Sequence, residues 1–349
     1  MQLPKNLPSP IGLSREEILG ILFREEYGYP PPRPTEVCAE ELEHIHGFHA
    51  GKASFTRLAI TVKGSFGTFT FPITYTNLLN AQAPVPAFIH LNFRPDIPDR
   101  YQPTEEILDH GFNILTIHYN DVTVDDPYGT QGDFTHGLAG VLYSNGTRKE
   151  TDAGKLALWA WAASAVMDYA QTLPELDHTR ISVVGHSRLG KTALLAGAID
   201  PRFFCAISND SGAGGAAIAR DKEGETIKDL CAHFPFWFCK KYAEHADCED
   251  AMPFDQHFLL AANATHLAYV ASAVEDTWAS PKNEYLSCVA ASEYFASVGK
   301  APFVHPDRLP EAGEFFHDGD IGYHLRDGAH TLSRTDWNLF IAYLKKHMA

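Results

Sequence analysis

A serine flanked by glycines is the residue best placed to do chemistry in this chain. Segment 181–195 has the pattern of an apolar strand, a tight turn that carries Ser187, and an apolar helix. This order matches a nucleophile elbow, in which the helix N-terminus favours a developing oxyanion. Gly185 and Gly190 supply small residues for the close approach of strand and helix, although Leu189 stands where a second glycine is usual. We therefore predict that Ser187 is a nucleophile rather than only a helix cap.

A serine hydroxyl needs a base, and His330 is the candidate. In α/β hydrolases the histidine comes late in the chain, on a loop before the last helix. His330 follows a strand-like segment at 321–325 and precedes an amphipathic helical pattern at 335–346. We expect its imidazole to take the proton of Ser187.

Two aspartates could orient that imidazole. Asp210 and Asp276 each follow a short apolar run, and both lie between the serine and the histidine, as the chain order of this fold requires. Glu275 is a third candidate. We favour Asp276 and leave Asp210 open; the carboxylate that is not the acid is expected to hold a neighbouring loop or the imidazole.

The elements around these residues alternate in type. Short apolar runs typical of buried strands are interspersed with helical patterns, which predicts a mostly parallel sheet with helices on both faces, the three-layer α/β-hydrolase fold. Two alternating segments ahead of them predict an antiparallel pair. An Asp- and Gly-rich stretch at 121–148 is predicted to be a long surface loop near the strand ends. The antiparallel pair is expected at 57–62 and 67–73, the buried strands at 85–91, 113–119, 181–184, 203–208 and 267–272, and helices at 155–171 and 191–199.

The N-terminal segment has a different pattern. Ser14 and Glu17 have the spacing of a capping box, which predicts a helix start, and a proline-rich run at 29–34 stops regular structure. We expect residues 1–50 to be an extension packed on the main domain and residues 51–349 to be the catalytic domain.

The composition argues against two classes of partner. Lys and Arg number 28 against 44 Asp and Glu, which gives a formal net charge of -16. Such a charge repels nucleic acid and anionic membrane surfaces. No segment approaches the roughly 18–20 consecutive apolar residues that a membrane span needs. We expect a protein that binds neither, and that is cytoplasmic unless a signal peptide was removed; the sequence makes no prediction of oligomeric state.

The spacing of cysteine and histidine gives no reason to expect a metal. No His-Glu-x-x-His or Cys-x-x-Cys pattern appears, so we predict neither a metal nor another cofactor. Cys205 lies in an apolar run, where a reduced thiol packs as a small hydrophobic group. The other cysteines are scattered, and we expect mostly free thiols; they are Cys38, Cys231, Cys239, Cys248 and Cys288.

Two motifs carry a family resemblance. Residues 185–191 match a Gly-x-Ser-Arg-x-Gly-Lys elbow, and residues 210–215 match a Glu-Ser-Gly-x-Gly-Gly stretch with Asp in the first place. Together they resemble the glucuronoyl esterases of carbohydrate esterase family 15 and their bacterial relatives, often labelled acetyl xylan esterase-like. The resemblance runs from about Ala87 to the end. It implies an α/β-hydrolase that cleaves carboxylic esters.

The resemblance also implies roles for residues outside the triad. It implies that Arg188 stabilises the oxyanion, that Lys191 and Glu225 hold sugar hydroxyls, and that Trp278 lines the sugar site. A guanidinium beside an oxyanion in a dry pocket stabilises the transition state strongly. The family usually has Glu at the position of Asp210. Because the Asp210 side chain is shorter, we still favour Asp276 as the acid of the triad.

A further difference lies beside the nucleophile. Fungal relatives have a disulfide-bonded cysteine before the nucleophile, where this chain has His186.

The expected reaction is a two-step acyl transfer through Ser187. The resemblance implies an ester of (4-O-methyl)glucuronic acid, in a small-molecule or oligosaccharide fragment of hemicellulose or a lignin–carbohydrate linkage. The alternative with the same fold is an acetyl esterase that acts on xylan or xylo-oligosaccharides. A non-catalytic sugar-binding protein is the alternative from another class, and the intact serine and histidine argue against it.

Overall fold

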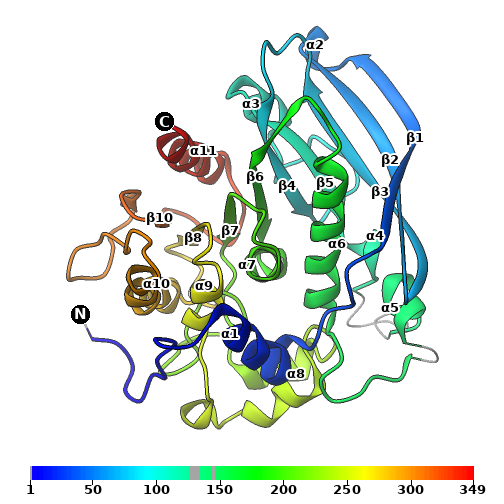
Figure 1. Cartoon of the computed structure of the whole chain (residues 1–349). Helices are drawn as coiled ribbons and strands as arrows, with labels where there is room; N and C mark the ends of the chain where they lie inside the picture. The colour runs from blue at the N-terminus through cyan, green and yellow to red at the C-terminus, as the bar shows by residue number, and fades with distance from the viewer. Residues whose placement is uncertain (1, 126–133, 144–145) are drawn as a thin grey trace.

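A single mixed sheet forms the centre of the molecule (Figure 1). The computed structural model describes residues 2–125, 134–143 and 146–349. Within these ranges the ten strands are ordered β1-β2-β3-β5-β4-β6-β7-β8-β10-β9. They are β1 (Glu36–Gly47), β2 (Ala53–Gly64), β3 (Gly67–Leu78), β4 (Val85–Asn92), β5 (Asn113–His118), β6 (Leu176–His186), β7 (Cys205–Asn209), β8 (Leu267–Ala273), β9 (Phe315–Phe316) and β10 (Ile321–Arg326).

The direction of the strands changes across this sheet. From β5 through β4, β6, β7 and β8 to β10 each neighbouring pair is parallel. Strands β1, β2 and β3 are antiparallel to their neighbours and join the parallel part at β5. The expected parallel sheet and the antiparallel pair before it are therefore confirmed, and both strands of that pair are longer than the sequence pattern indicated.

Helices cover both faces of the sheet (Figure 1). One face packs against α6, α7 and α9, and the other against α3 and α11. Neighbouring residues of one strand serve the two sides: Phe88 of β4 contacts Trp337 of α11, with ring centroids 5.2 Å apart, while Ile89 belongs to the core beneath α6 and α7. This two-sided burial explains the continuous apolar runs in the sequence. The helices are α1 (Arg15–Leu22), α2 (Phe48–Gly51), α3 (Thr104–Asp109), α4 (Tyr119–Val122), α5 (Gly137–Leu142), α6 (Lys155–Ala170), α7 (Arg188–Ile199), α8 (Ile227–His233), α9 (His257–Ala262), α10 (Pro281–Ser297) and α11 (Arg334–Met348).

The N-terminal segment begins as the sequence predicts. The Ser14 hydroxyl accepts a hydrogen bond from the Glu17 amide, and the Glu17 carboxylate accepts one from the Ser14 amide, which completes the capping box at the start of α1. Strand β1 was not predicted. Its burial pattern is exposed along nearly its whole length, so it lacks the apolar alternation that marks a half-buried strand. Part of the expected extension therefore joins the sheet, while the domain division at residue 50 stays a prediction.

The stretch 121–148 is not simply the long surface loop that its composition predicted. It contains helix α5, and Phe134 and Leu138 are buried in the main core. Residues 126–133 and 144–145 of the predicted loop lie outside the described residues. A helix of six residues with two glycines gives almost no periodic signal, so only tertiary packing identifies it.

Two other expectations concern chemistry outside the sheet. All six cysteines are free thiols in the structure, as predicted, and Cys205 is fully buried. Among the described residues, no helix combines the length and apolar character needed to span a bilayer.

Candidate active site

Ser187 lies in a strained turn between β6 and α7. Its φ of 57° and ψ of -128° are unfavourable for a residue with a side chain, and such strain is typical of functional turns. The turn is held because the Ser187 amide donates to the Asn209 carbonyl of β7 at 2.8 Å. Gly185 has no substitute here, since a Cβ would lie 2.1 Å from the Leu189 carbonyl oxygen. The local geometry is that of a nucleophile elbow.

The unusual position of the second glycine has a packing explanation. Leu189 is fully buried in the core beneath the sheet, so the helix uses this position for an apolar contact. A Cβ on Gly190 would lie 3.0 Å from the Asn209 carbonyl oxygen and 3.1 Å from the Ser208 hydroxyl. The first turn of α7 therefore approaches β7 through Gly190 rather than through the residue before it.

His330 has an aspartate partner. Its Nδ1 lies 2.6 Å from Oδ2 of Asp276, which follows β8. Burial alone would raise the pKa of Asp276, but the hydrogen bond and charge of His330 hold it below the usual value. An ionised carboxylate here fixes the ring so that Nε2 is the nitrogen available to a hydroxyl.

Asp210 has a different partner. Its Oδ2 accepts from Nη2 of Arg326 at 3.0 Å and from the Thr331 amide at 3.3 Å. Burial, and then the nearby Glu284, raise the pKa of Asp210, against the opposing charge of Arg326. The structure thus joins Asp276, not Asp210, to the imidazole, while Asp210 supports the loop that carries His330. Glu275 is exposed.

One cavity of about 330 Å³ collects the residues singled out in the sequence. It is lined by the candidate triad residues, both aspartates included, and by the residues expected to hold the oxyanion and the sugar. Phe234 and Trp237 add an aromatic wall. The predicted residues in this lining are Ser187, Arg188, Lys191, Asp210, Glu225, Asp276, Trp278 and His330.

The expected sugar-binding residues form a hydrogen-bonded row. Lys191 is almost fully buried, and its Nζ donates to the Ser211 carbonyl at 2.6 Å and lies 3.4 Å from Oε2 of Glu225. The other oxygen of Glu225 accepts from Nε1 of Trp278 at 3.3 Å. Trp278 remains 53% exposed, so its ring is available to a ligand at the edge of the cavity.

The sequence did not identify the residues around the Arg188 guanidinium. Trp237 lies beneath it, with 4.5 Å from the guanidinium carbon to the ring centroid. Asp125 makes an ion pair with Nη1 of Arg188 and accepts from Nε1 of Trp237 at 3.0 Å. The aromatic run 234–238 was a usable signal for the wall. Asp125 had none, because it lies in the irregular stretch after α4 and meets Arg188 only in the folded chain.

Comparison with known proteins gives the family. The family model described as glucuronyl esterase of fungi matches residues 58–299. This chain belongs to the glucuronyl esterase family. A carbohydrate esterase named MZ0003, from an unknown prokaryotic organism, is 37% identical over 246 residues, which cover 70% of this chain and 55% of the relative.

Two further similarities extend this result. The 4-O-methyl-glucuronoyl methylesterase of Podospora anserina is 27% identical over 82% of this chain and 56% of its own length. The chain therefore spans a little over half the length of these two curated relatives. The solved glucuronoyl esterase structure from Solibacter usitatus superposes with a TM-score of 0.87 and 29% identity, covering 100% of this chain and 98% of that chain. The predicted α/β-hydrolase fold is confirmed.

His186 is the neighbour of the nucleophile in this member of the family. Burial, and then the proximity of His330, lower the pKa of His186 to about 3. Its Nδ1 lies 2.6 Å from Oδ1 of Asn209, whose amide nitrogen donates to Asp336. Because that Asn209 oxygen must accept, His186 carries its proton on Nδ1. The ring centroids of His186 and His330 are 4.4 Å apart, so a neutral ring packs against the imidazole.

A cation at this site would have to displace existing contacts. Donor atoms of Asp210, Asp276 and His330 lie within 4.8 Å of one another. The bond between His330 and Asp276 occupies two of these donors, and Arg326 binds the carboxylate of Asp210, the third residue. The arrangement of Asp210, Asp276 and His330 is therefore explained by an imidazole and the two carboxylates that support it.

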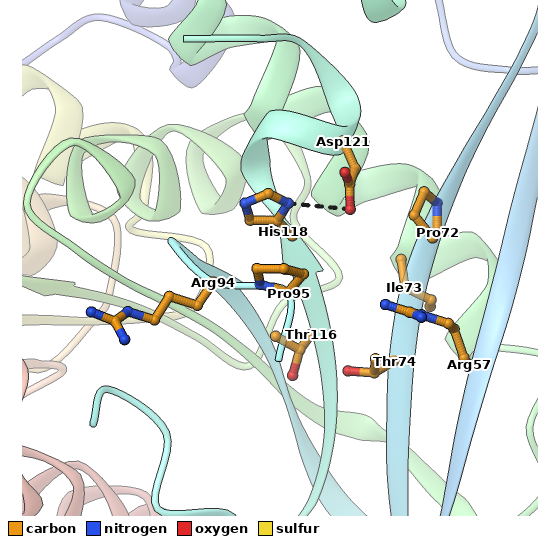
Figure 2. Close-up of a pocket in the computed structure, with 9 residues that line it drawn as sticks. All are labelled: Arg57, Pro72, Ile73, Thr74, Arg94, Pro95, Thr116, His118 and Asp121. Carbon is orange, nitrogen blue, oxygen red and sulfur yellow. Dashed lines mark ion pairs between the residues drawn. The ribbon is translucent and has the colours of Figure 1, made fainter. Parts of the chain in front are cut away.

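A second crevice near the strand ends is too small for a substrate. Figure 2 shows it between β2, β3, β5 and the loop after β4, with the Arg57 side chain directed into it and Arg94 directed away. Its volume of about 10 Å³ is close to the minimum that holds one water molecule. The cavity beside Ser187 is the candidate binding site because it is lined by Ser187, His330 and Asp276 together.

Proposed function

We propose that this protein is a serine carboxylic-ester hydrolase with Ser187 as nucleophile, His330 as general base and Asp276 as the acid that orients it. The observation that carries the proposal is the 2.6 Å hydrogen bond between His330 and Asp276, in the same cavity as the strained Ser187. A buried carboxylate that fixes a partly exposed imidazole beside a serine is the arrangement that activates a hydroxyl for attack.

The reaction takes two steps. The Ser187 oxygen attacks the ester carbonyl carbon while His330 accepts the hydroxyl proton, and the same proton passes to the departing alkoxide. A water molecule then attacks the acyl-enzyme and gives a proton to His330, which passes it to the departing Ser187 oxygen as the acid is released. The backbone amide and side chain of Arg188, at the start of α7, would stabilise the negative oxygen in both steps.

The substrate we propose is an ester of (4-O-methyl)glucuronic acid. Family membership and the names of the relatives support the acid, and the cavity supports a sugar. Lys191 and Glu225 offer charged hydrogen-bonding groups for hydroxyls, and the exposed Trp278 offers a flat apolar face. An open cavity of about 330 Å³ suits a monosaccharide ester or the end of an oligosaccharide.

The test is the initial rate of hydrolysis of methyl and benzyl glucuronate beside acetylated xylose. We expect the wild-type protein to hydrolyse the glucuronate esters and Ser187→Ala to reduce the rate by at least about 10⁴-fold. Release of acetyl groups alone would replace the proposed substrate with the acetyl ester alternative. Hydrolysis that survives in folded Ser187→Ala would reject the nucleophile.

Covalent labelling provides a separate check of the serine. An organophosphonate should modify Ser187 and no other residue, as read by mass spectrometry of peptides. Ser211 lines the same cavity but donates to Glu284, so Ser211→Ala is the matched control and should still be labelled.

A further inference from the structure

Among the residues that the structure describes, Asp125 is the carboxylate that pairs with the charged end of Arg188. Asp125 lies 2.5 Å from Nη1 of Arg188 through Oδ2, and its Oδ1 accepts from the indole of Trp237. The same indole ring lies beneath the guanidinium, and Phe234 stacks on it with ring centroids 3.9 Å apart. Asp125 therefore holds both the guanidinium and the ring on which the guanidinium rests. Its side chain is 3% exposed, whereas that of Arg188 is 23% exposed towards the cavity.

Asp125 is held in place from its own side. Its amide donates to the Asn120 side chain at 2.8 Å, across the end of α4. At the start of α4, His118 and Asp121 are ion-paired at 3.2 Å (Figure 2). The backbone that carries the carboxylate is thus held against the end of α4.

The charge of this pair matters because hydrolysis creates a charge. An ester is neutral, but the acid released from Ser187 is an anion at neutral pH. A guanidinium without a partner would attract that carboxylate far more than the ester, since electrostatic attraction is strong in a partly buried site. Asp125 already neutralises Arg188, so the pair has no net charge to retain the product.

We infer that Asp125 is a positioning residue that sets the selectivity of the site for neutral ester over carboxylate product, by fixing Arg188 and neutralising its charge. The inference rests on the proposed ester hydrolysis and adds a basis for product release. It applies to any carboxylic ester, because each gives a carboxylate next to Ser187.

The test measures ligand binding without turnover. In a Ser187→Ala background, calorimetric titration gives the dissociation constants of glucuronate and of methyl glucuronate with Asp125 or with Asp125→Asn. We expect the substitution to tighten glucuronate binding by about tenfold and to change methyl glucuronate binding by less than about twofold. Acetate serves as a second anionic probe and should follow glucuronate.

Matched variants separate charge from structure. Asp121→Asn removes a charge from the same turn that does not pair with Arg188, while its amide can still bond to His118, and the anion-to-ester ratio should stay at the wild-type value. Adding Arg188→Met to Asp125→Asn should abolish the gain for the anion. Asp125→Ser, which is neutral and smaller, repeats the measurement if the Asn variant does not fold, as judged by thermal melting.

The outcomes distinguish this inference from the proposed function. An unchanged anion-to-ester ratio in a folded Asp125 variant, or no binding of either anion, overturns the inference even when the active protein hydrolyses glucuronate esters. A shifted ratio in a protein that hydrolyses no ester supports the role of Asp125 towards Arg188 and rejects the reaction instead.

Discussion

Two aspartates at the ends of neighbouring strands, Asp210 and Asp276, have different partners and different roles. Asp210 follows β7 and Asp276 follows β8, strands that pair in parallel up to Asn209 and Ala271. Both are buried and both line the same cavity. Asp276 bonds to the partly exposed imidazole of His330, whereas Asp210 bonds to the buried guanidinium of Arg326. Position at a strand end therefore does not choose the acid; the partner does.

The electrostatic environments follow from those partners. Asp276 has its pKa held down by His330, despite burial, so it stays ionised. Asp210 shares Arg326 with Asp336, whose two oxygens each accept from Nε of that arginine at 2.9 Å. Burial, then the nearby Glu284 and to a smaller extent Asp336, raise the pKa of Asp210, whereas the guanidinium of Arg326 opposes this rise.

The largest expected effect is on kcat when each of the two aspartates is replaced by asparagine. Asp276→Asn should lower kcat by about 10³–10⁴-fold, because an amide cannot hold the imidazole in the required tautomer or stabilise its charge. Asp210→Asn preserves the shape and should lower kcat by no more than about tenfold. Steady-state kinetics on the ester that the wild type cleaves measures both. The reverse order would assign the acid to Asp210.

The next effect concerns stability on the Asp210 side. Arg326→Met would remove the cation that buried Asp210 and Asp336 share, leaving Asp336 its contacts with His324 and Ser333, and should lower the free energy of unfolding by about 3–5 kcal/mol. Urea denaturation followed by fluorescence measures the loss. Arg334→Met is the control, since its ion pair with Glu106 is exposed and worth about 0–1 kcal/mol. Equal losses in the two variants would contradict the structural role given to Arg326.

The pH dependence of stability should have opposite signs for the two aspartates. A lowered folded pKa means that Asp276 stabilises above the unfolded pKa of about 4, and that this contribution is lost as the pH falls through the folded value. A raised folded pKa means that Asp210 favours folding at low pH and that this contribution is lost as the pH rises from about 4 towards its folded value.

Asparagine variants of the two aspartates test these opposite pH dependences of stability. As the pH falls below about 4, the stability gap between wild type and Asp276→Asn should shrink. As the pH rises from about 4 to 7, the gap between wild type and Asp210→Asn should shrink. Urea denaturation at a series of pH values gives both gaps. Gaps that change in parallel would show that the two carboxylates have equivalent environments.

The smallest expected effect concerns His186, whose ring lies between His330 and the Asn209–Asp336 contact. His186 packs on His330 and connects through Asn209 to Asp336. With a pKa of about 3, it should stay neutral through the pH range in which the protein is folded and assayed. Imidazole nitrogen shifts in NMR should show a ring, assigned to His186 by its absence from His186→Gln, that does not titrate above about pH 4.5. A His186 ring that titrates near neutrality would contradict this environment.

Short-range patterns in the sequence predicted what short-range physics controls. The strand, turn and helix around Ser187 depend on residues within a few positions of one another, and so does the capping box at Ser14. The apolar runs predicted the strands because burial on both faces leaves no polar positions. The sequence did not predict strand β1 because the strand is exposed, and it did not predict α5 because the helix is short.

Contacts between distant parts of the chain were decided only in the tertiary structure. Motifs and family resemblance predicted residues that line the cavity. They did not predict which of these residues form hydrogen bonds or ion pairs with one another. Asp276 meets His330 across 54 positions, and Arg326 meets Asp210 across 116. Asp125 meets Arg188 across 63 positions and left no pattern in the sequence. Local sequence fixes backbone conformation, whereas the partner of a buried charge depends on which strand ends and loops the completed sheet brings together.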